Sequence, residues 1–584
     1  MSDIQDLEKM RHSLSHIMAA AVKNLYAGTT TVQFGIGPAI DNGFYYDIDF
    51  GGVKVSEDDF KKIEKEMRKI IAQKLPIERS EKSRAEALKW AKDNGQKYKE
   101  ELINDLPEDE VISFYKLGDF EDLCRGPHVD NTGEVGVFKL DKVAGAYWRG
   151  DEKREMLTRL YGLAFATQEE LDDYLKMQEE AKKRDHRKIG KELGLFCYSD
   201  LVGAGLPLFT PKGTILRDMV AALANGYRER CGYQKVCIPH IANIDLYKTS
   251  GHFEKFPEML RFTSTESGDE LALKPVNCPH HSQIFASVPR SYKELPVKFL
   301  ETTMVYRDER KGELGGLSRV RAITQDDSHV FCTEEQVGDI FGELIESAKD
   351  LYKRIGMQLK LRLSFRDDGD GYIGTPEMWE KAQNSIKEMA EKFEMDYSIG
   401  EGEAAMYGPK MDFMAVDALG REWQLATVQL DYAMPTRFGL EYTAEDGSKK
   451  TPIMIHCALL GSIERFLSVF IEHTAGWFPF WCAPEQVRIL TINDSVNDYV
   501  LKIRKILEDI ELNDPIEHNK IRYTVDDRNE SLGKKIREAT KMKIPCAIIV
   551  GPKDAEAGEV SVRLRDKEEK VRLENLANFI EKLS

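Results

Sequence analysis

The chain has 584 residues and a formal net charge of −17, so its length predicts roughly three to five domains and its charge provides no general attraction for nucleic acid. Its 42% hydrophobic and 31% charged content is ordinary for a globular protein, and no apolar run approaches the roughly 20 residues that cross a bilayer. The nine cysteines form no Cys-x-x-Cys pair and the N-terminus does not look like a secretion signal, which favours a cytoplasmic protein with free thiols and excludes a secreted disulfide framework.

Residues 1–165 mix short strand-like runs with charged amphipathic helices, which predicts an α+β domain. Residues 58–73 are expected to form a helix, because apolar side chains recur there at helical spacing. These side chains are Phe60, Ile63, Met67 and Ile70. The segment 166–193 opens with a capping-box pattern at Thr167–Glu170 and is polar on nearly every side. Such a segment suits a connection between domains, so we expect a linker helix there.

Residues 194–483 are rich in aromatic and β-branched runs broken by Gly and Pro, with helical stretches at 213–231 and 335–354. This pattern predicts an antiparallel sheet flanked by helices. In residues 484–584 strands alternate with helices, which predicts a small α/β domain with a largely parallel sheet. The expected strands are 487–491, 522–525 and 546–550, and the expected helices are 495–508, 532–541 and 576–583.

Residues 307–330 concentrate arginines and other polar side chains between the apolar residues Val320, Ile323 and Val330, which suggests a β-hairpin. The guanidinium group matches phosphate oxygens, so repeated arginines on buried-looking strands indicate an anionic ligand. The alternative is a charged antiparallel face paired with acidic neighbours, and the arginine cluster taken alone favours it. The arginines are Arg307, Arg310, Arg319 and Arg321, and the further polar residues are Gln325, Asp327 and His329.

Three segments, taken in order, resemble the signature motifs of class II aminoacyl-tRNA synthetases. They are the helix from Gly213 that leads to Ile238-Pro239, the run Phe299–Glu309 before the arginines, and His456–Phe466 with its glycine turn at Gly461. Further motifs make the chain similar to the threonyl-tRNA synthetase family over essentially its whole length. These are NCP at Asn277–Pro279, TQDDSH at Thr324–His329 and YGPK at Tyr407–Lys410.

The resemblance implies that 194–483 is the catalytic domain, where threonine and ATP give threonyl-adenylate before transfer to tRNA(Thr). Attack of a carboxylate on a phosphate needs positioning and charge stabilisation more than a general base. By the resemblance, Arg307 holds the α-phosphate, Glu309 the adenine and Arg465 the γ-phosphate, with Mg²⁺ bound to ATP. Arg319 is expected to contact the nucleotide or the terminal adenosine of the tRNA.

In this family the positions that match Cys278, His329 and His456 bind one Zn²⁺ per subunit, which reads threonine through its amino and hydroxyl groups. Their spacing gives no zinc-finger pattern, and singly each is more often a buried cysteine or a hydrogen-bonded histidine. Valine has no hydroxyl, and loss of such a polar partner costs on the order of 10⁴-fold. Many members carry Gly where this chain has His280, so an alternative ligand at His280 or His281 stays open.

The resemblance also implies the residues that shape the amino-acid pocket, with Asp327 accepting the threonine hydroxyl. The other expected substrate-binding residues are Gln325, Tyr407, Lys410, Gln424, Thr427 and Ser462.

Serine keeps the hydroxyl and lacks only a methyl group, which contributes about 1–3 kcal/mol of discrimination, so a proofreading site is expected. His12 and His16 lie four positions apart, on one face of a helix, and Cys124 with His128 adds a thiol and a third imidazole. Together these motifs look like the editing domain shared by threonyl- and alanyl-tRNA synthetases. We expect them, with Asp122, to position a water that hydrolyses Ser-tRNA(Thr). The donor set could bind zinc, and we expect no metal.

The resemblance implies an anticodon-binding domain at 484–584, with Asn529 and Arg563 as candidates for base contacts; ordinary surface residues are the alternative. It also implies a homodimer with the helix and strand around Pro239 at the interface. Many members begin with a β-grasp domain, which we expect to be missing here because His12 lies almost at the start of the chain. Two rivals, a paralogue with changed amino-acid choice and a non-catalytic RNA-binding regulator, are disfavoured by the intact arginines and the Cys–His–His set.

Overall fold

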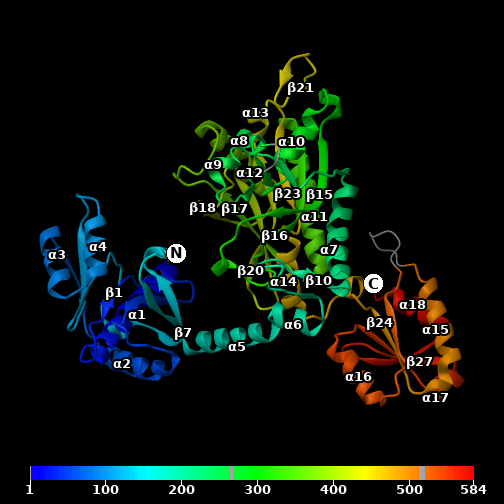
Figure 1. The fold of residues 1–584 in the computed structure, drawn as a ribbon, viewed down its shortest axis with the longest axis horizontal. Helices are drawn as coiled ribbons and strands as arrows, with labels where there is room; N and C mark the ends of the chain where they lie inside the picture. Colours follow the sequence, from blue (N-terminus) through cyan, green and yellow to red (C-terminus); the bar gives the residue numbers. More distant parts are fainter. Residues whose placement is uncertain (1, 152, 263–267, 512–519, 584) are drawn as a thin grey trace. The chain divides into compact units, whose positions relative to one another are not determined.

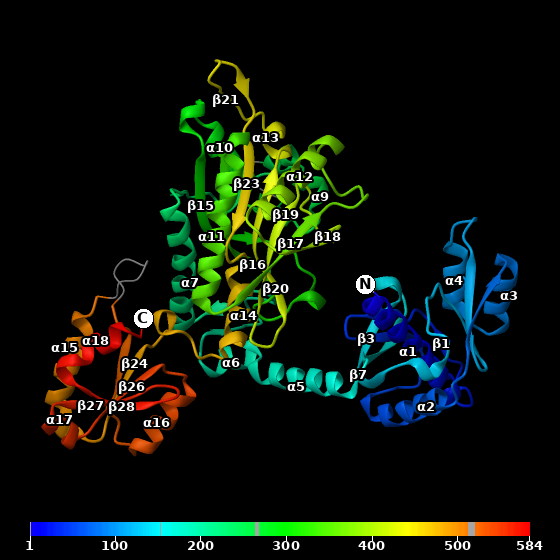
Figure 2. The same cartoon turned by 180° about the vertical axis from the view of Figure 1, so that it is seen from behind.

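The structure is a computed structural model that describes residues 2–151, 153–262, 268–511 and 520–583. The chain divides into two compact units, Met1–Glu179 and Glu180–Ser584, and Figures 1 and 2 show its ribbon from two opposite sides. Among the described helices, none is long and apolar enough to cross a membrane.

The first unit contains two sheets, and it has the α+β composition that its sequence predicts. Helices α1 and α2 pack on the larger sheet, which has the order β1-β3-β8-β7 with β2 paired to β3, and α3 and α4 accompany the sheet β4-β5-β6. The predicted helix at 58–73 is present as α2. The elements are α1 Ser2–Tyr26, β1 Gln33–Phe34, β2 Ala39–Ile40, β3 Gly43–Asp49, α2 Phe60–Ala72, β4 Ile77–Lys82, α3 Arg84–Asp93, α4 Lys97–Asp105, β5 Ile112–Leu117, β6 Phe120–Leu123, β7 Val137–Tyr147 and β8 Met156–Phe165.

The connecting segment consists of two helices, α5 (Gln168–Arg184) and α6 (His186–Glu192), and not of one. Asp185 lies between them with non-helical dihedral angles (φ −47°, ψ 119°), and its side chain accepts a hydrogen bond from the backbone N–H of Arg187. An aspartate in this position caps a new helix. The expectation of a single continuous linker helix is therefore wrong at this residue.

The second unit is built around an eight-stranded sheet with the order β11-β15-β16-β23-β20-β19-β17-β18. The inner strands pair antiparallel, and parallel pairing is confined to the edge pairs β11–β15 and β17–β18, which confirms the predicted antiparallel domain. The strands are β11 Gln234–Lys235, β15 Val297–Tyr306, β16 Ala322–Cys332, β17 Gln358–Phe365, β18 Tyr397–Glu401, β19 Lys410–Val416, β20 Glu422–Asp431 and β23 Ile453–Ala458.

Three helices, α7 (Pro211–Arg230), α11 (Val337–Ile355) and α14 (Ile463–Thr474), pack on one face of this sheet and share its hydrophobic core (Figures 1 and 2). The helix α10 (Cys278–Ala286) packs against β16 with a separate apolar cluster. The remaining elements are β9 Phe196–Cys197, β10 Leu208–Phe209, β12 Ile241–Asn243, α8 Asp245–Ser250, α9 His252–Lys255, β13 Arg261–Phe262, β14 Leu271–Leu273, α12 Pro376–Lys392, α13 Ala433–Arg437, β21 Tyr442–Thr443 and β22 Lys449–Lys450.

Strands β15 and β16 pair antiparallel as predicted, but the arginines do not lie on them. Arg307 follows the last residue of β15, and Arg310, Arg319 and Arg321 belong to the connection 307–321. Val320, which suggested a strand, is only 2% exposed and packs as a loop residue. An apolar side chain can be buried without being in a strand, so the predicted hairpin was too long on its arginine side.

The C-terminal part of the second unit contains a five-stranded sheet with the order β25-β24-β26-β27-β28. Its first three strands are parallel, whereas β26–β27 and β27–β28 are antiparallel, so the expected largely parallel sheet is mixed. Only residues 551–558 connect β26 to β27, and a parallel crossover needs a dozen or more. The elements are β24 Val487–Thr491, α15 Asn497–Asp509, β25 Tyr523–Asp526, α16 Leu532–Lys541, β26 Cys546–Val550, α17 Pro552–Ala557, β27 Glu559–Arg563, β28 Glu568–Arg572 and α18 Leu576–Glu581.

Candidate functional site

Strand β16 separates two chemistries by the alternation of its side chains. Thr324 and Asp326 point toward the helices: Thr324 Oγ1 bonds Glu464 of α14 at 2.7 Å, and Asp326 pairs with the buried Arg228 of α7. Gln325, Asp327 and His329 therefore face the opposite side of the sheet, which α7, α11 and α14 do not cover. The same face receives His456, because β23 places it directly beside His329.

An extra residue in β20 extends this face. The register between β19 and β20 shifts between Phe413 and Met414, so the pairing skips Leu425. One additional residue reverses the alternation, and Gln424 thereby faces the same side as Thr427. The contacts agree: Arg362 Nη2 lies 3.1 Å from Gln424 Oε1 and 3.5 Å from the carboxylate of Asp412, which accepts a hydrogen bond from Thr427 Oγ1 at 2.9 Å.

A pocket of about 420 Å³, called here the arginine pocket, lies at this face where β16, β20 and β23 meet the loop 307–321. Among its described lining residues, three guanidinium groups face one carboxylate, so the lining is positive and suits an anion. All four predicted catalytic residues and four of the predicted substrate-binding residues line it. The residues are Arg307, Glu309, Arg319, Arg465, Gln325, Gln424, Thr427 and Ser462.

The arginines of this pocket differ in their partners. Arg319 Nε lies 2.7 Å from Glu309 Oε2, so the loop pairs its own acid and base. Arg307 has a buried Nε without a hydrogen-bond partner in the described part of the chain, and its guanidinium lies over the Phe256 ring at 5.0 Å. Arg465 lies in the first turn of α14, and Ser462 Oγ accepts its backbone N–H, a contact that leaves its guanidinium free. Arg307 and Arg465 thus keep guanidinium groups available for an anionic ligand.

Lys410 is not among the residues that line the arginine pocket. Its Nζ is 3.2 Å from Asp412 Oδ2, on the row of side chains next to Thr427. It therefore neutralises a fully buried carboxylate that also holds Thr427. The geometry favours a supporting contact for Lys410.

The three predicted metal ligands meet in one buried cluster, called here the Cys–His–His cluster. One donor atom each of Cys278, His329 and His456 lies within 4.8 Å of the other two. Burial lowers the pKa of His329 and raises that of Cys278, so the imidazole is neutral and the thiol protonated near pH 7. A sulfur and two imidazole nitrogens are the donors that zinc prefers, and three protein ligands leave room for substrate. His280 does not belong to this group.

One hydrogen bond and one ring contact orient His456 in this cluster. His456 Nε2 lies 3.0 Å from Asp431 Oδ2, and the Tyr407 ring stacks on the His456 ring with centroids 4.4 Å apart. Asp327 is 6% exposed and accepts a hydrogen bond from the Asn277 amide at 2.9 Å. Burial raises the pKa of Asp327. Asp327 and Tyr407 therefore lie beside the cluster, as their predicted roles require.

The first unit also assembles its predicted residues into one group, called here the histidine cluster: His12, His16, Cys124 and His128. The two histidines of α1 meet a loop that follows β6, where Cys124 Sγ lies 3.2 Å from His12 Nε2 and 3.3 Å from His128 Nε2. Ser13 Oγ contacts His128 Nδ1 at 3.1 Å. The helix spacing and the loop together bring thiol and imidazoles into contact.

Burial suppresses charge throughout the histidine cluster. It lowers the pKa of His128 to about 3 and that of His12 and His16 below the ordinary value, and it raises the pKa of the Cys124 thiol to about 11. Neutral imidazoles can accept hydrogen bonds from water and can bind metal. A protonated thiol is a weaker ligand than a thiolate.

Asp122 has partners that sequence reasoning missed. Its carboxylate is fully buried, pairs with Lys99 Nζ at 2.8 Å and accepts a hydrogen bond from the Tyr46 hydroxyl. His16 Nε2 lies 4.0 Å away. Lys99 comes from α4 and Tyr46 from β3, so no local spacing links them to Asp122. Lys99 stands in a charged run and Tyr46 precedes Asp47, so the sequence around them gives no signal of this contact.

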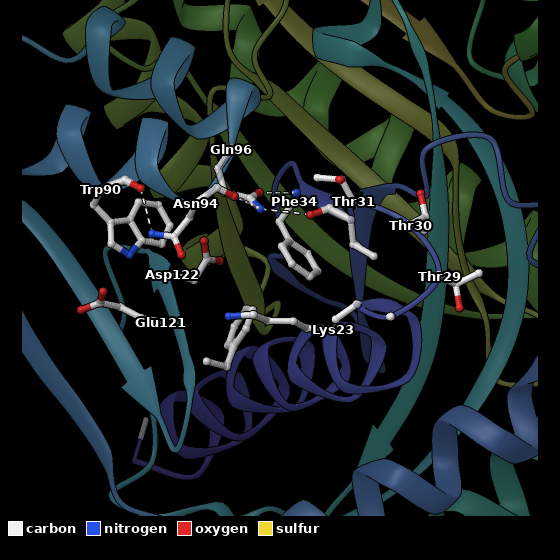
Figure 3. A pocket seen from close by; sticks show the side chains of 14 residues that line it. Lys23, Thr29, Thr30, Thr31, Phe34, Trp90, Asn94, Gln96, Glu121 and Asp122 are labelled. Atoms are coloured by element: carbon white, nitrogen blue, oxygen red, sulfur yellow. Dashed lines mark hydrogen bonds between the residues drawn. The ribbon is translucent and has the colours of Figure 1, made fainter.

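A pocket of about 460 Å³ in the first unit has Asp122 in its lining (Figure 3). Gln96 fixes one wall, because it accepts the backbone N–H of Phe34 at 2.8 Å and donates to Val32 O at 3.0 Å. The volume of this pocket lies in the range of small-ligand pockets. The labelled lining residues are Lys23, Thr29, Thr30, Thr31, Phe34, Trp90, Asn94, Gln96, Glu121 and Asp122.

A buried histidine ties the connecting segment to residues 307–321, called here the arginine loop. His186 Nδ1 lies 2.7 Å from Glu472 Oε1 on α14, and its Nε2 accepts the backbone N–H of Leu317 at 3.0 Å. Both ring nitrogens are therefore used, which leaves neither to bind a metal although Asp185, His186 and Glu472 are close together. No motif in the sequence predicts this contact.

The two predicted anticodon residues lie on different elements of the C-terminal sheet. Asn529 is exposed in the loop between β25 and α16, and Arg563 is exposed at the end of β27, 3.5 Å from Glu568. These two strands are not neighbours in the sheet. The structure does not bring the two side chains together by pairing.

Three family models match the chain. Residues 260–474 match a tRNA synthetase class II core domain (G, H, P, S and T), residues 486–583 an anticodon binding domain, and residues 112–161 the threonyl and alanyl tRNA synthetase second additional domain.

Curated relatives match along nearly the whole chain. A threonine–tRNA ligase from Gloeobacter violaceus is 49% identical over 579 residues, covering 97% of this chain and 90% of the relative. One from Parabacteroides distasonis is 48% identical over 564 residues, covering 96% and 85%.

Solved structures match about two thirds of the chain. The RNA binding domain of threonyl-tRNA synthetase from Cryptosporidium parvum is 32% identical with a TM-score of 0.64, covering 68% of this chain and 98% of that one. A prolyl-tRNA synthetase from the same organism, at 19% identity and TM-score 0.53, covers 68% of this chain and 74% of that one, and it shares the fold.

Proposed function

The chain belongs to the threonine–tRNA ligase family, and on that premise we propose which of its residues carry out the reactions. Activation of L-threonine with ATP and transfer to tRNA are the reactions of the class II core, and the additional domain is associated with editing. The observation that carries the proposal is the adjacency on one sheet face of an arginine pocket and a Cys–His–His cluster. One serves a nucleotide and the other an amino acid.

Arg307, Arg319 and Arg465 bind the phosphates and stabilise the charge that develops on them as the threonine carboxylate attacks the α-phosphate. Arg307 contacts the α-phosphate and Arg465 the γ-phosphate, with Mg²⁺ accompanying ATP. Fixed donors in a partly enclosed site act in this way without reorganisation, which makes them effective. Glu309 holds Arg319 in place, at 2.7 Å, and offers its carboxylate to the adenine.

Cys278, His329 and His456 would hold one Zn²⁺. Zinc held there would supply a Lewis acid for the amino and hydroxyl groups of threonine. Asp327 accepts the threonine hydroxyl proton in a hydrogen bond, and Asn277 holds its carboxylate at 2.9 Å. Tyr407, Gln325 and Gln424 limit the volume around the side chain. Valine is rejected because it cannot satisfy the buried Asp327.

The histidine cluster hydrolyses Ser-tRNA(Thr) without a metal. Its neutral imidazoles accept hydrogen bonds from the attacking water, and the low pKa of His128 makes that residue a positioning group and a weak base. Asp122, held by Lys99 and Tyr46, fixes the polar wall beside it. Serine is admitted here because the synthetic site cannot exclude a side chain that lacks only one methyl.

The C-terminal sheet binds the anticodon, with Asn529 and Arg563 in contact with bases. The protein is a cytoplasmic homodimer in which α7 and the segment around Pro239 meet their symmetry mates. Exposed apolar side chains in the chain before α7 and just after Pro239 support the interface: Leu201, Val202, Leu208 and Ile241. Sedimentation would give twice the monomer mass, and a monomeric active enzyme would contradict this part.

Amino-acid-dependent pyrophosphate exchange tests the synthetic proposal. Threonine and serine should drive exchange and valine should not, and a zinc chelator should abolish it. Failure of threonine in the zinc-loaded protein would overturn the ligase assignment.

For editing, a variant with His12→Ala and His16→Ala should threonylate normally and leave Ser-tRNA(Thr) intact. Rapid deacylation by that variant would reject the histidine cluster.

A further inference from the structure

Two adjacent histidines on α10 have different environments. His281 is fully buried, and its Nδ1 lies 2.8 Å from Nδ1 of His329. The other ring nitrogen, Nε2, lies 3.7 Å from Glu301 Oε2, and neither atom has a hydrogen-bond partner in the described part of the chain. His280 has no hydrogen-bond partner on either ring nitrogen in the same residues. A buried donor and a buried acceptor without partners, so close together, are expected to pair.

Glu301 is fixed from its other side. It lies on β15 directly beside Asp327 of β16, and its Oε1 accepts the backbone N–H of Ile238 at 3.0 Å. Glu301 is 8% exposed, so both carboxylate oxygens act inside the protein. The carboxylate is therefore a fixed acceptor that faces His281.

The position of each proton follows from these contacts. Nδ1 of His329 faces His281, so Nε2 is the atom left to face a metal, and a metal-binding imidazole carries its proton on the other nitrogen. His329 Nδ1–H then donates to His281 Nδ1 at 2.8 Å, which leaves the proton of His281 on Nε2. That N–H faces Glu301 Oε2 at 3.7 Å, so the contact is an electrostatic one between a donor and a carboxylate and is longer than a hydrogen bond. Asp327 Oδ1 lies 3.8 Å from His329 Nε2, the nitrogen that would face the metal, and does not contact Nδ1.

We propose that His281 and Glu301 are positioning residues that hold His329 in the tautomer and orientation needed to bind Zn²⁺. The inference rests on the proposed zinc site and adds residues outside its ligand set. His456 has the equivalent support in one step, from Asp431 at 3.0 Å. His329 is supported by two residues in series, His281 and then Glu301; these contacts are called here the relay. The last contact of the relay is the hydrogen bond from the Ile238 N–H to Glu301, next to Pro239. The segment proposed to meet the partner subunit therefore also supports the metal ligand.

Glu301→Gln tests the direction of the relay at almost unchanged volume. The oxygen of the new amide is required at the Ile238 N–H, so its NH₂ group faces His281 Nε2. That donor favours the opposite tautomer of His281, which then donates to His329 Nδ1 and moves the His329 proton to Nε2, where a metal should bind. Loss of such an outer partner typically lowers metal affinity about 10–100-fold.

The experiment measures the zinc dissociation constant of the full-length protein by competition with a chromogenic chelator. Glu301→Gln and His281→Phe should weaken zinc binding about 10–100-fold. His281→Gln keeps one acceptor and one donor and should lose less. His280→Ala, the adjacent buried histidine without partners, is the matched control and should bind zinc like the unaltered protein. In cobalt-loaded protein, Glu301→Gln should shift the visible absorption bands, whereas His280→Ala should not.

The possible failures are distinguishable. If the unaltered protein binds no zinc, or Cys278→Ser binds it equally well, the proposed zinc site is wrong. If the unaltered protein binds zinc and Glu301→Gln binds it with the same affinity, the relay is wrong although the zinc site stands. Equal weakening by His280→Ala would show a general effect on α10 and would also reject the relay. The side chain of Gln has almost the same volume as that of Glu, so Glu301→Gln should fold normally. The test therefore stands even if His281→Phe does not fold.

Discussion

Arg319 and Glu309 form an ion pair inside one loop, with Nε and Oε2 2.7 Å apart, while Arg319 Nη2 also reaches Glu313 at 3.0 Å. Glu309 is nearly buried and Glu313 is 42% exposed. Two carboxylates therefore compete for the same guanidinium in different surroundings. The less exposed pair should matter more, because water screens the exposed one.

Double-mutant cycles on ATP-dependent pyrophosphate exchange should separate these two pairs. Arg319→Ala and Glu309→Ala should each lower kcat/KM for ATP, and their combination should lose less than the product of the two, with a coupling of about 0.5–3 kcal/mol. The matched cycle with Glu313→Ala should give about 1 kcal/mol or less. Equal coupling in both cycles would contradict the buried pairing.

Asp327→Asn should relax the choice between threonine and valine. The variant loses a charged acceptor whose hydrogen bond contributes about 1.5–3 kcal/mol, so the ratio of kcat/KM values for threonine and valine should fall about 10–100-fold. KM for ATP should stay unchanged, since Asp327 lies outside the lining of the arginine pocket. An unchanged amino-acid ratio would remove Asp327 from the selectivity site.

Lys99→Met should destabilise the first unit, because it leaves the buried Asp122 carboxylate without its cation. Removal of one partner of a buried pair costs about 3–5 kcal/mol. Lys97→Met is the matched control: its ammonium is 47% exposed, 3.4 Å from Glu155, and should cost about 1 kcal/mol or less. Calorimetry should show a lower unfolding transition for Lys99→Met alone, and adding Asp122→Asn should restore most of it. A wild-type transition in Lys99→Met would contradict the burial of this charge.

Acid should weaken the first unit through His128. Burial lowers its pKa to about 3 in the folded protein, below the ordinary value near 6.5. Between these two pH values the unfolded chain binds a proton at His128 and the folded chain does not. Stability from this group is complete above about pH 6.5 and declines as the pH falls toward 3. Thermal unfolding measured across pH 7 to 4 should show a smaller decline for His128→Gln. The same decline in that variant would refute the shift.

His186→Phe should raise KM for ATP about 10-fold and leave KM for threonine unchanged. It removes a neutral hydrogen bond from the Leu317 N–H and a contact with the Glu472 carboxylate, and both contacts hold the loop 307–321 in place. His186→Gln can still donate and accept a hydrogen bond, so its KM for ATP should lie between those of the unaltered protein and His186→Phe. A rise in both KM values would indicate a general loss of structure instead of a displaced arginine loop.

Local patterns in the sequence predicted much of this fold. The helix at 58–73 follows from apolar spacing, the helical stretch expected at 213–231 is present as α7, and the antiparallel central sheet follows from its strand-like runs. The alternation of Gln325, Asp327 and His329 on one strand places them on one face, which a two-residue period dictates. Such features depend on neighbours in the chain, and the sequence displays them directly.

Other features depend on contacts that no local pattern records. Lys99 and Tyr46 meet Asp122 from separate elements, and Glu301 meets His281 across the face of the sheet. The skipped residue Leu425 is visible only in the pairing of two strands. The end of one helix and the start of the next at Asp185 could have been predicted, because aspartate is a common helix N-cap residue. The segment has charged residues on every side, so this one aspartate did not stand out.

The residues of the Cys–His–His cluster lie on α10, β16 and β23, and Cys278 and His456 are far apart in the chain. Closing so long a loop is entropically costly, so these three donors meet only after the central sheet has formed. A chain still emerging from the ribosome before His456 is made has no complete site. Metal uptake should therefore come late in folding and stabilise only the native topology. Zinc retention after refolding would then measure the fraction of molecules whose central sheet has closed correctly.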